Sequence, residues 1–285
     1  MLDQSLVGYR NEAPVGGGMR GFVCGRRTSL RLLALGAVTE WMLDRAAAQP
    51  AGARAAPAVR MATVVIDPGH GGADPGAIGN SGVYEKDIAL SAAWEFARQL
   101  AATRRYRVVL TRSKDEFIPL RERVARARAW HADLFLSIHA DALPDPQKRG
   151  LSVFTLAEAS DRDAAIIAAH ENRADLVAGM NLARQPREVG EFLMDLARRQ
   201  TENPSITLAR KIVDQLSREV ILLGRPQRSA EFVVLTAPDI PSALIELGCV
   251  SNPQEEHLLQ QHAYQQKLAR GLVRAVEAYF VLAKN

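Results

Sequence analysis

Apolar runs rich in valine, isoleucine and leucine alternate along the chain with amphipathic segments of helical spacing. The runs predict buried strands at residues 63–68, 106–112, 133–141 and 150–156, and two further strands within 231–252 on either side of Ala237 and Pro238. The amphipathic segments predict helices at residues 85–102, 120–130 and 206–224, a helix start at 252–255, and C-terminal helices with Leu268, Leu272, Val276 and Phe280 four residues apart. We therefore expect the α/β class: a single domain with a mostly parallel, twisted sheet of about six strands, flanked by helices on both faces.

The first 61 residues do not follow this pattern. Residues 1–18 are glycine-rich, and Met19 is an alternative start. Arg26 and Arg27 precede a modest apolar stretch, and residues 46–48 form an A-x-A cleavage signature. We expect residues 1–48 to be an export signal similar to twin-arginine signals, residues 49–61 to be a linker, and residues 62–285 to be the catalytic domain.

Composition excludes some partners and leaves the compartment open. The 36 basic and 32 acidic residues are interspersed, so the net charge of +4 gives no basic block suited to nucleic acid. The apolar stretch near the N-terminus is too short to span a bilayer, and we expect no stable membrane span. Cys24 and Cys249 are the two cysteines, and removal of residues 1–48 would leave one thiol and no intramolecular disulfide. We expect a monomer.

Two histidines and two glutamates occupy equivalent places in the predicted fold. His70, His139 and Glu246 each end a predicted strand, and Glu85 begins the helix after the first strand. Because the carboxyl ends of parallel strands meet at one edge of a sheet, these side chains are expected to converge. Two histidines and a glutamate form a known catalytic zinc set, which leaves a second carboxylate, Glu246, to move protons.

Each of these residues also has an ordinary structural interpretation. A histidine at a strand end can simply be hydrogen-bonded, Glu85 can be a first-turn acid favoured by the helix dipole, and Glu246 can pair with an arginine. The glycine-rich loop around His70 lacks the Lys-Ser/Thr of a P-loop and the G-x-G-x-x-G spacing. The metal hypothesis rests on all four residues lying at one edge of one sheet.

Four segments carry a resemblance to a known family. VVIDPGHGGADPGA, YEKDIAL, LFLSIHADA and RSAEFVVLTAPDIPSALIELGCVSNPQEE resemble the zinc-dependent N-acetylmuramoyl-L-alanine amidases of the cell-division type. The resemblance implies hydrolysis of the amide between the lactyl group of muramic acid and the first L-alanine of the stem peptide of peptidoglycan, in the periplasm. By matching position, it implies that His70, Glu85 and His139 bind Zn²⁺ and that Glu246 is the catalytic glutamate.

Residues 158–203 are helical by pattern, interrupted by Gly179 and Pro186, and longer than a crossover requires. They resemble a segment of the cell-division amidases that occludes the zinc until an activator protein displaces it. Glu171 is the first candidate for the blocking carboxylate and Glu158 the second. The alternative for each is an ordinary acid on a solvated helix, and His170 is expected at the surface.

The sequence leaves two other functions open. The residues alone do not choose the scissile bond, so a zinc peptidase or deacetylase acting on another amide stays possible. A non-catalytic wall-binding or regulatory protein could also use the same fold, although the proposed ligands and general base are all present.

Overall fold

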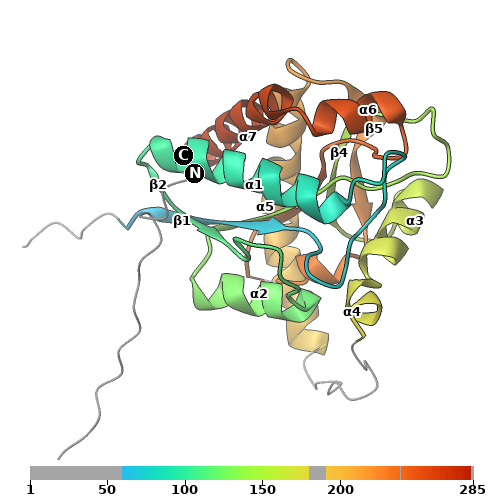
Figure 1. Cartoon of the computed structure of the whole chain (residues 1–285). Helices are drawn as coiled ribbons and strands as arrows, with labels where there is room; N and C mark the ends of the chain where they lie inside the picture. The colour runs from blue at the N-terminus through green and yellow to red at the C-terminus, as the bar shows by residue number, and fades with distance from the viewer. Residues whose placement is uncertain (1–59, 180–190, 238, 284–285) are drawn as a thin grey trace, which may run out of the picture. The chain divides into compact units, whose positions relative to one another are not determined.

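The computed structural model describes residues 60–179, 191–237 and 239–283, all within one compact unit that spans Pro57–Asn285. Its centre is one six-stranded sheet (Figure 1). The strands are β1 (Ala62–Pro68), β2 (Tyr106–Leu110), β3 (Leu134–His139), β4 (Leu151–Leu156), β5 (Leu222–Ala230) and β6 (Ser242–Glu246). The expected export signal at 1–48, and the expected linker at 49–61 except for Arg60 and Met61, lie outside the described residues.

The sheet has the strand order β2-β1-β3-β6-β4-β5. All neighbouring strands run parallel except β4 and β6, which are antiparallel. In the pairing of β3 with β6, His139 lies opposite Glu246. The mostly parallel sheet of the predicted α/β class is therefore confirmed, and its register places two of the predicted site residues side by side.

Helices cover both faces of the sheet, as predicted. The helices are α1 (Glu85–Ala102), α2 (Leu120–Ala129), α3 (Arg162–Glu171), α4 (Ala174–Val177), α5 (Glu191–Leu216), α6 (Pro253–Leu259) and α7 (His262–Leu282). On one face, α1, α5 and α7 pack against Val64, Ile66 and Leu136. On the other face, α2, α3 and the short 3-10 helix η2 (Val233–Leu235) pack with Val65 and Phe135.

The region between α5 and β6 differs from the prediction. The predicted helix at 206–224 is part of a longer helix that begins at Glu191, passes through Pro204 and ends at Leu216. The strand beside β4 is not 231–237 but Leu222–Ala230, which contains Gly224 and Pro226. Residues 231–237 instead form η2 and its flanks, whose apolar side chains enter the core below the sheet.

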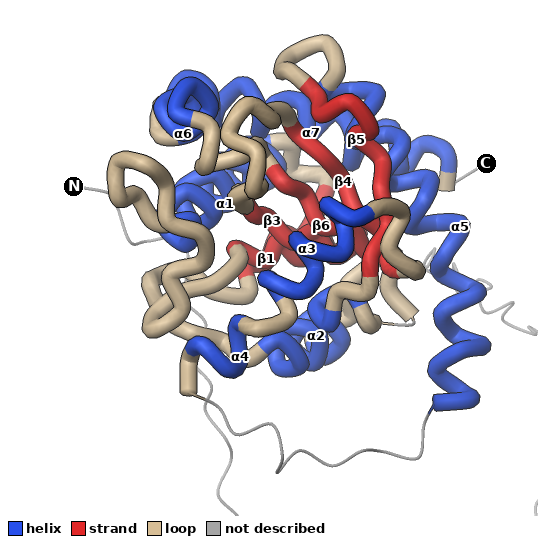
Figure 2. The backbone as a smooth tube through the Cα atoms, turned by 90° about the vertical axis from the view of Figure 1, so that its right-hand side faces the viewer, coloured by secondary structure: helices blue, strands red, loops and turns tan. Residues whose placement is uncertain are grey.

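The predicted insertion at 158–203 holds α3, α4 and the first half of α5, and residues 180–190 lie outside the described residues. Helix α3 lies in front of β1 and β3 in the view onto the carboxyl ends of these strands (Figure 2), and its last residue, Glu171, contacts His70 and His139 there. Among the described residues, no helix is long and apolar enough to cross a membrane.

Candidate active site

The loop after β1 holds its histidine in a constrained conformation. His70 has φ of 56°, in the left-handed region that side chains seldom adopt, and 3% of it is exposed. Two glycines make room around it. A Cβ on Gly69 would lie 2.3 Å from the His139 ring, and a Cβ on Gly76 would lie 2.6 Å from the His70 ring. Only glycine leaves both imidazoles in place.

Four predicted side chains meet at this edge of the sheet. His70 Nε2 lies 3.1 Å from Glu85 Oε2, and His139 Nδ1 lies 3.1 Å from Glu85 Oε1. Glu171 Oε2 lies 3.1 Å from His70 Nε2 and 2.9 Å from His139 Nδ1. One donor atom from each of these four residues lies within 4.8 Å of the other three, and all four residues are buried.

Glu85 is fixed by the backbone of two segments that are distant in sequence. Its Oε2 accepts a hydrogen bond of 2.8 Å from Ala77 N–H, and its Oε1 accepts one of 2.9 Å from Ala140 N–H. The carboxylate therefore connects the loop after β1 to the end of β3. Glu85 is therefore more than a first-turn acid favoured by the helix dipole, because its carboxylate is fully buried.

A chain of hydrogen bonds orients each imidazole from behind. His70 Nδ1 lies 2.7 Å from Asp74 Oδ2. His139 Nε2 lies 3.1 Å from Ser137 Oγ, and that hydroxyl donates a 2.8 Å hydrogen bond to Asp67 Oδ2. Because the hydroxyl gives its proton to Asp67, it accepts one from His139 Nε2–H, and Nδ1 is the nitrogen that faces Glu85 and Glu171.

These orienting residues, Asp74, Ser137 and Asp67, were not predicted from the sequence. A signal was present for Ser137, which precedes His139 by two positions and so shares its side of the strand. Asp74 follows His70 by four residues, and Asp67 is a charged residue at the end of an apolar run.

Glu246 lies beside this cluster but is not part of it. Its Oε2 accepts a 2.9 Å hydrogen bond from Asp141 N–H, and among the described residues no group bonds its buried Oε1. Burial raises the pKa of Glu246 well above its usual range, and Asp141, Glu171 and Glu85 raise it further against the lowering effect of His139. Burial also raises the pKa of Asp141, to about 6.

The two candidates for a blocking carboxylate have different positions. Glu171 is the last residue of α3 and is 3% exposed. Glu158 is exposed in the connection between β4 and α3, outside the cluster. His170, expected at the surface, is partly exposed, and its Nδ1 lies 3.4 Å from both Asp141 Oδ1 and Glu171 Oε1.

The charges of the cluster balance one another. Burial lowers the pKa of His139, but Glu171 and Glu85 outweigh it and raise that pKa to about 10. Burial likewise lowers the pKa of His70, whereas Glu85, Glu171 and Asp74 raise it to well above the usual value. Burial alone would raise the pKa of Glu171, but His139 and His70 hold it well below its usual range. Protonated imidazoles thus neutralise two buried carboxylates, one of which lies unfavourably at a helix C-terminus.

Comparison with known proteins finds a matching family model and relatives of similar sequence. Residues 64–278 match the family model described as N-acetylmuramoyl-L-alanine amidase. The chain is 41% identical over 219 residues to the N-acetylmuramoyl-L-alanine amidase AmiA of Escherichia coli K12, covering 76% of this chain and 75% of that protein. It is 40% identical over 222 residues to AmiC of Neisseria meningitidis serogroup B, covering 77% of this chain and 53% of that protein.

Solved structures of amidases have a similar fold. The N-acetylmuramoyl-L-alanine amidase of Clostridium difficile 630 superposes with a TM-score of 0.57 at 26% identity, covering 78% of this chain and 98% of that one. The amidase AmiC2 of Nostoc punctiforme gives the same four values. Since the family model covers residues 64–278, which include every residue of the buried cluster, the chain belongs to the N-acetylmuramoyl-L-alanine amidase family.

Proposed function

We propose that this chain is a zinc-dependent hydrolase that cleaves the amide between the lactyl group of muramic acid and the L-alanine of the stem peptide in peptidoglycan. The observation that carries the proposal is the convergence of His70, Glu85 and His139 from separate elements, with Glu246 opposite His139 on the neighbouring strand. Membership of the amidase family supports the choice of this amide over that of a peptidase or deacetylase.

The donor set suits zinc. Two imidazole nitrogens and one carboxylate leave room for a fourth ligand, as in catalytic zinc sites. His70 Nε2 is buried and, among the described residues, accepts and donates no hydrogen bond of good geometry, which is the expected state of an atom reserved for a metal. We assign His70, Glu85 and His139 as the ligands. When bound there, zinc would supply an activated water and polarise the substrate carbonyl.

Glu246 is the proposed general base and acid. Asp141 N–H holds one of its oxygens and leaves Oε1 available to take a proton from water and deliver it to the departing amine of L-alanine. Its raised pKa suits that work, because a carboxyl group of ordinary pKa would hold a proton too weakly at neutral pH to pass it on. Ser137 and Asp67 hold the His139 ring in the required tautomer.

Glu171 is the proposed blocking carboxylate, and α3 is the element that carries it. Its Oε2 contacts both imidazoles, so it occupies the place where a fourth ligand would lie. We propose that the segment 158–203 keeps the enzyme inactive until an activator moves α3, and that Glu158 has no such role. We further propose that residues 1–48 direct the chain to the periplasm, where it acts as a monomer.

The decisive experiment incubates the purified chain with cell-wall sacculi. We expect slow release of stem peptides with a free N-terminal L-alanine from the native chain and faster release from Glu171→Gln, with loss of both in the presence of a zinc chelator and recovery on adding zinc. Release that the chelator does not change would overturn the zinc assignment. If no peptide is released even when Glu171 is replaced by glutamine, the proposed hydrolysis is wrong and a wall-binding function takes its place.

A further inference from the structure

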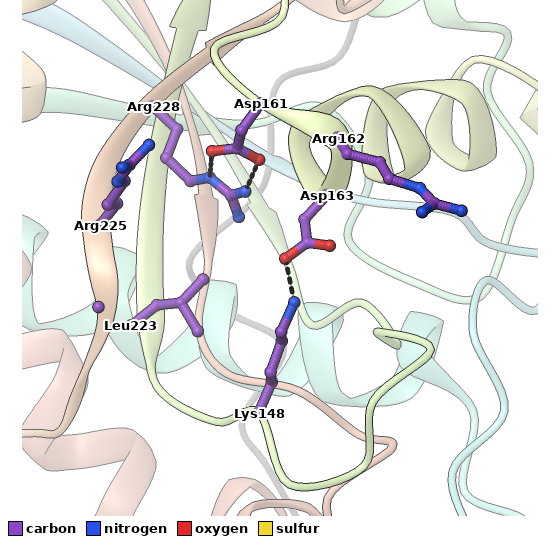
Figure 3. A pocket seen from close by; sticks show the side chains of 8 residues that line it. Lys148, Asp161, Arg162, Asp163, Leu223, Arg225 and Arg228 are labelled. Atoms are coloured by element: carbon purple, nitrogen blue, oxygen red, sulfur yellow. Dashed lines mark hydrogen bonds and ion pairs between the residues drawn. The ribbon is translucent and has the colours of Figure 1, made fainter.

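A cavity lined mostly by charged residues lies at the other end of α3 from Glu171, between α3 and β5. It has a volume of about 560 Å³. Its charged lining residues are Lys148, Asp161, Arg162, Asp163, Arg225 and Arg228, an excess of two positive charges. Figure 3 shows these side chains around the space, which Leu223 closes on one side. A cavity of this charge and size favours an anionic group with part of a larger molecule attached.

Arg228 is the residue that marks this cavity as a binding site. It is 5% exposed, and its guanidinium lies over the Phe154 ring at 5.4 Å from the centroid. Its Nε and Nη2 donate to the carboxylate of Asp161. Its Nη1 is buried and bonds no group among the described residues, and Figure 3 shows it pointing into the cavity. A buried guanidinium nitrogen without an acceptor is costly, and a ligand oxygen would satisfy it.

The two acids that line the cavity already pair with its cations, which shows that these cations bind carboxylates. Asp161 caps α3 by accepting a hydrogen bond from Ala164 N–H, and it pairs with Arg228. Asp163, in the first turn of the helix, pairs with Lys148. The N-terminal end of α3 is therefore held by two carboxylates on two cations, while its C-terminal end presents Glu171 to the histidines.

The distance between the two ends of α3 fits a peptide. A helix of ten residues spans about 14 Å at 1.5 Å per residue. An extended peptide covers about 14 Å in four residues. If the scissile amide of a stem peptide lies at the histidine cluster, the rest of the peptide extends away from it toward the C-terminus. After about four residues the peptide has covered the length of α3, and its terminal carboxylate would reach this cavity.

We propose that this cavity is a subsite for the C-terminal carboxylate of the stem peptide, bound by Arg228 and Lys148, and that Asp161 and Asp163 hold these cations in place of the substrate. The inference rests on the proposed function for the identity of the peptide. In this arrangement α3 imitates the substrate at both ends: Glu171 lies at the histidines and Asp161 lies at Arg228.

The test measures binding of a synthetic tetrapeptide that begins with L-alanine, as the free acid and as the C-terminal amide, to the full chain by calorimetry. We expect the free acid to bind roughly tenfold more tightly, the factor that one charge-assisted hydrogen bond provides. Arg228→Met should reduce the affinity for the acid toward that for the amide, leaving only the contribution of Lys148. Arg121→Met, at an exposed arginine of α2, should change neither affinity.

A second variant keeps the test decisive if Arg228→Met fails to fold. Asp161→Asn preserves helix capping, because asparagine caps as well as aspartate does, but it removes the internal competitor for Arg228. It should tighten binding of the acid by a factor on the order of ten and leave the amide unchanged. Equal affinities for acid and amide in the native chain, or no effect of Asp161→Asn, would overturn the subsite. Release of peptide from sacculi, measured separately, reports on the proposed hydrolysis alone.

Discussion

Glu246 and Glu171 are both buried carboxylates beside His139, yet their pKa values move in opposite directions. Glu171 contacts both imidazoles within 3.1 Å and stays ionised. Glu246 has one backbone donor and the Asp141 carboxyl for a neighbour, so its charged form is disfavoured. The environments thus separate Glu171, which stays charged and pairs with cations, from Glu246, which can exchange a proton.

Replacement of Glu246 by glutamine should remove turnover and leave the metal site intact. The amide keeps the shape and the contact with Asp141 N–H but cannot take a proton, so we expect stem-peptide release to fall by about 10²–10⁴-fold. Zinc content, measured on the same samples, should be unchanged. Glu122→Gln, at an exposed glutamate of α2, is the control. Retained turnover in Glu246→Gln would contradict the assignment of the base.

Ser137→Ala should weaken metal binding without disturbing the fold. Removal of the hydroxyl takes away the acceptor for His139 Nε2–H and leaves that ring free to adopt the wrong tautomer. Losses of about 10–100-fold in zinc affinity are typical for such groups behind a ligand. A chelator competition titration measures the change, with Ser152→Ala, at a buried serine of β4, as the matched control. Equal zinc affinities in the two variants would exclude the orienting role.

The sequence was sufficient to predict the residues at strand ends but not those that support them. His70, His139 and Glu246 stand out because a polar residue after an apolar run has few structural reasons to be there. Asp67 and Ser137 matter through contacts with Thr111, Arg123 and His139, which depend on how strands pair. Periodicity does not encode that pairing.

At the scale of whole elements, the prediction failed where local preference and tertiary position disagree. EFVVLTA, at residues 231–237, has the β-branched and aromatic residues of a strand, whereas LLGRPQRSA, at residues 222–230, carries Gly224 and Pro226. The second segment is nevertheless β5, because an edge strand tolerates proline and polar residues on its open side. The first segment buries Phe232, Val234 and Leu235 in the core through a 3-10 turn.

Helix α3 joins the two sites, and its last residue offers a direct test of inhibition. Glu171→Gln removes the charge that holds α3 to both imidazoles, an interaction between charged groups worth about 1.5–3 kcal/mol. We expect the rate of peptide release to rise by at least about tenfold. Glu158→Gln changes a glutamate of the same segment that lies outside the cluster and should leave the rate unchanged. A rate that falls in Glu171→Gln would make Glu171 part of the active enzyme instead of its inhibitor.

Helix α2 supports the active-site loop through one buried side chain. Arg123 pairs with Asp67 at 3.0 Å and donates to the backbone oxygens of Pro68 and His70. Arg123→Ala leaves a buried carboxylate with one fewer cation, which costs about 3–5 kcal/mol of unfolding free energy. Denaturant titration measures this loss, and Arg121→Ala, on the exposed side of the same helix, should cost less than about 0.5 kcal/mol. A small loss at Arg123 would mean that the loop keeps its conformation without α2.

For the molecule as a whole, the proposed metal site forms only when the sheet is formed, because its ligands come from the loop after β1, the start of α1 and the end of β3. Zinc that binds this assembled site therefore stabilises the folded chain by mass action. Without zinc, the protonation of the two histidines depends on pH. With the pKa of His139 raised to about 10 and that of His70 raised as well, both imidazoles carry protons at neutral pH. Zinc must displace those protons.

The extra stability conferred by zinc should consequently increase with pH. Each released proton tightens binding about tenfold per pH unit, so two protons add about 2.7 kcal/mol per pH unit at fixed excess zinc. Between pH 6 and 8, both below the pKa of His139, the zinc-induced rise in melting temperature should grow steadily. Calorimetry in buffers of different ionisation enthalpy counts the protons directly. Glu171→Gln removes one of the carboxylates that raise both histidine pKa values, so it should release fewer protons and show a shallower dependence. If the native chain takes up zinc without releasing protons, the two imidazoles are already neutral before zinc binds and the raised pKa values are contradicted.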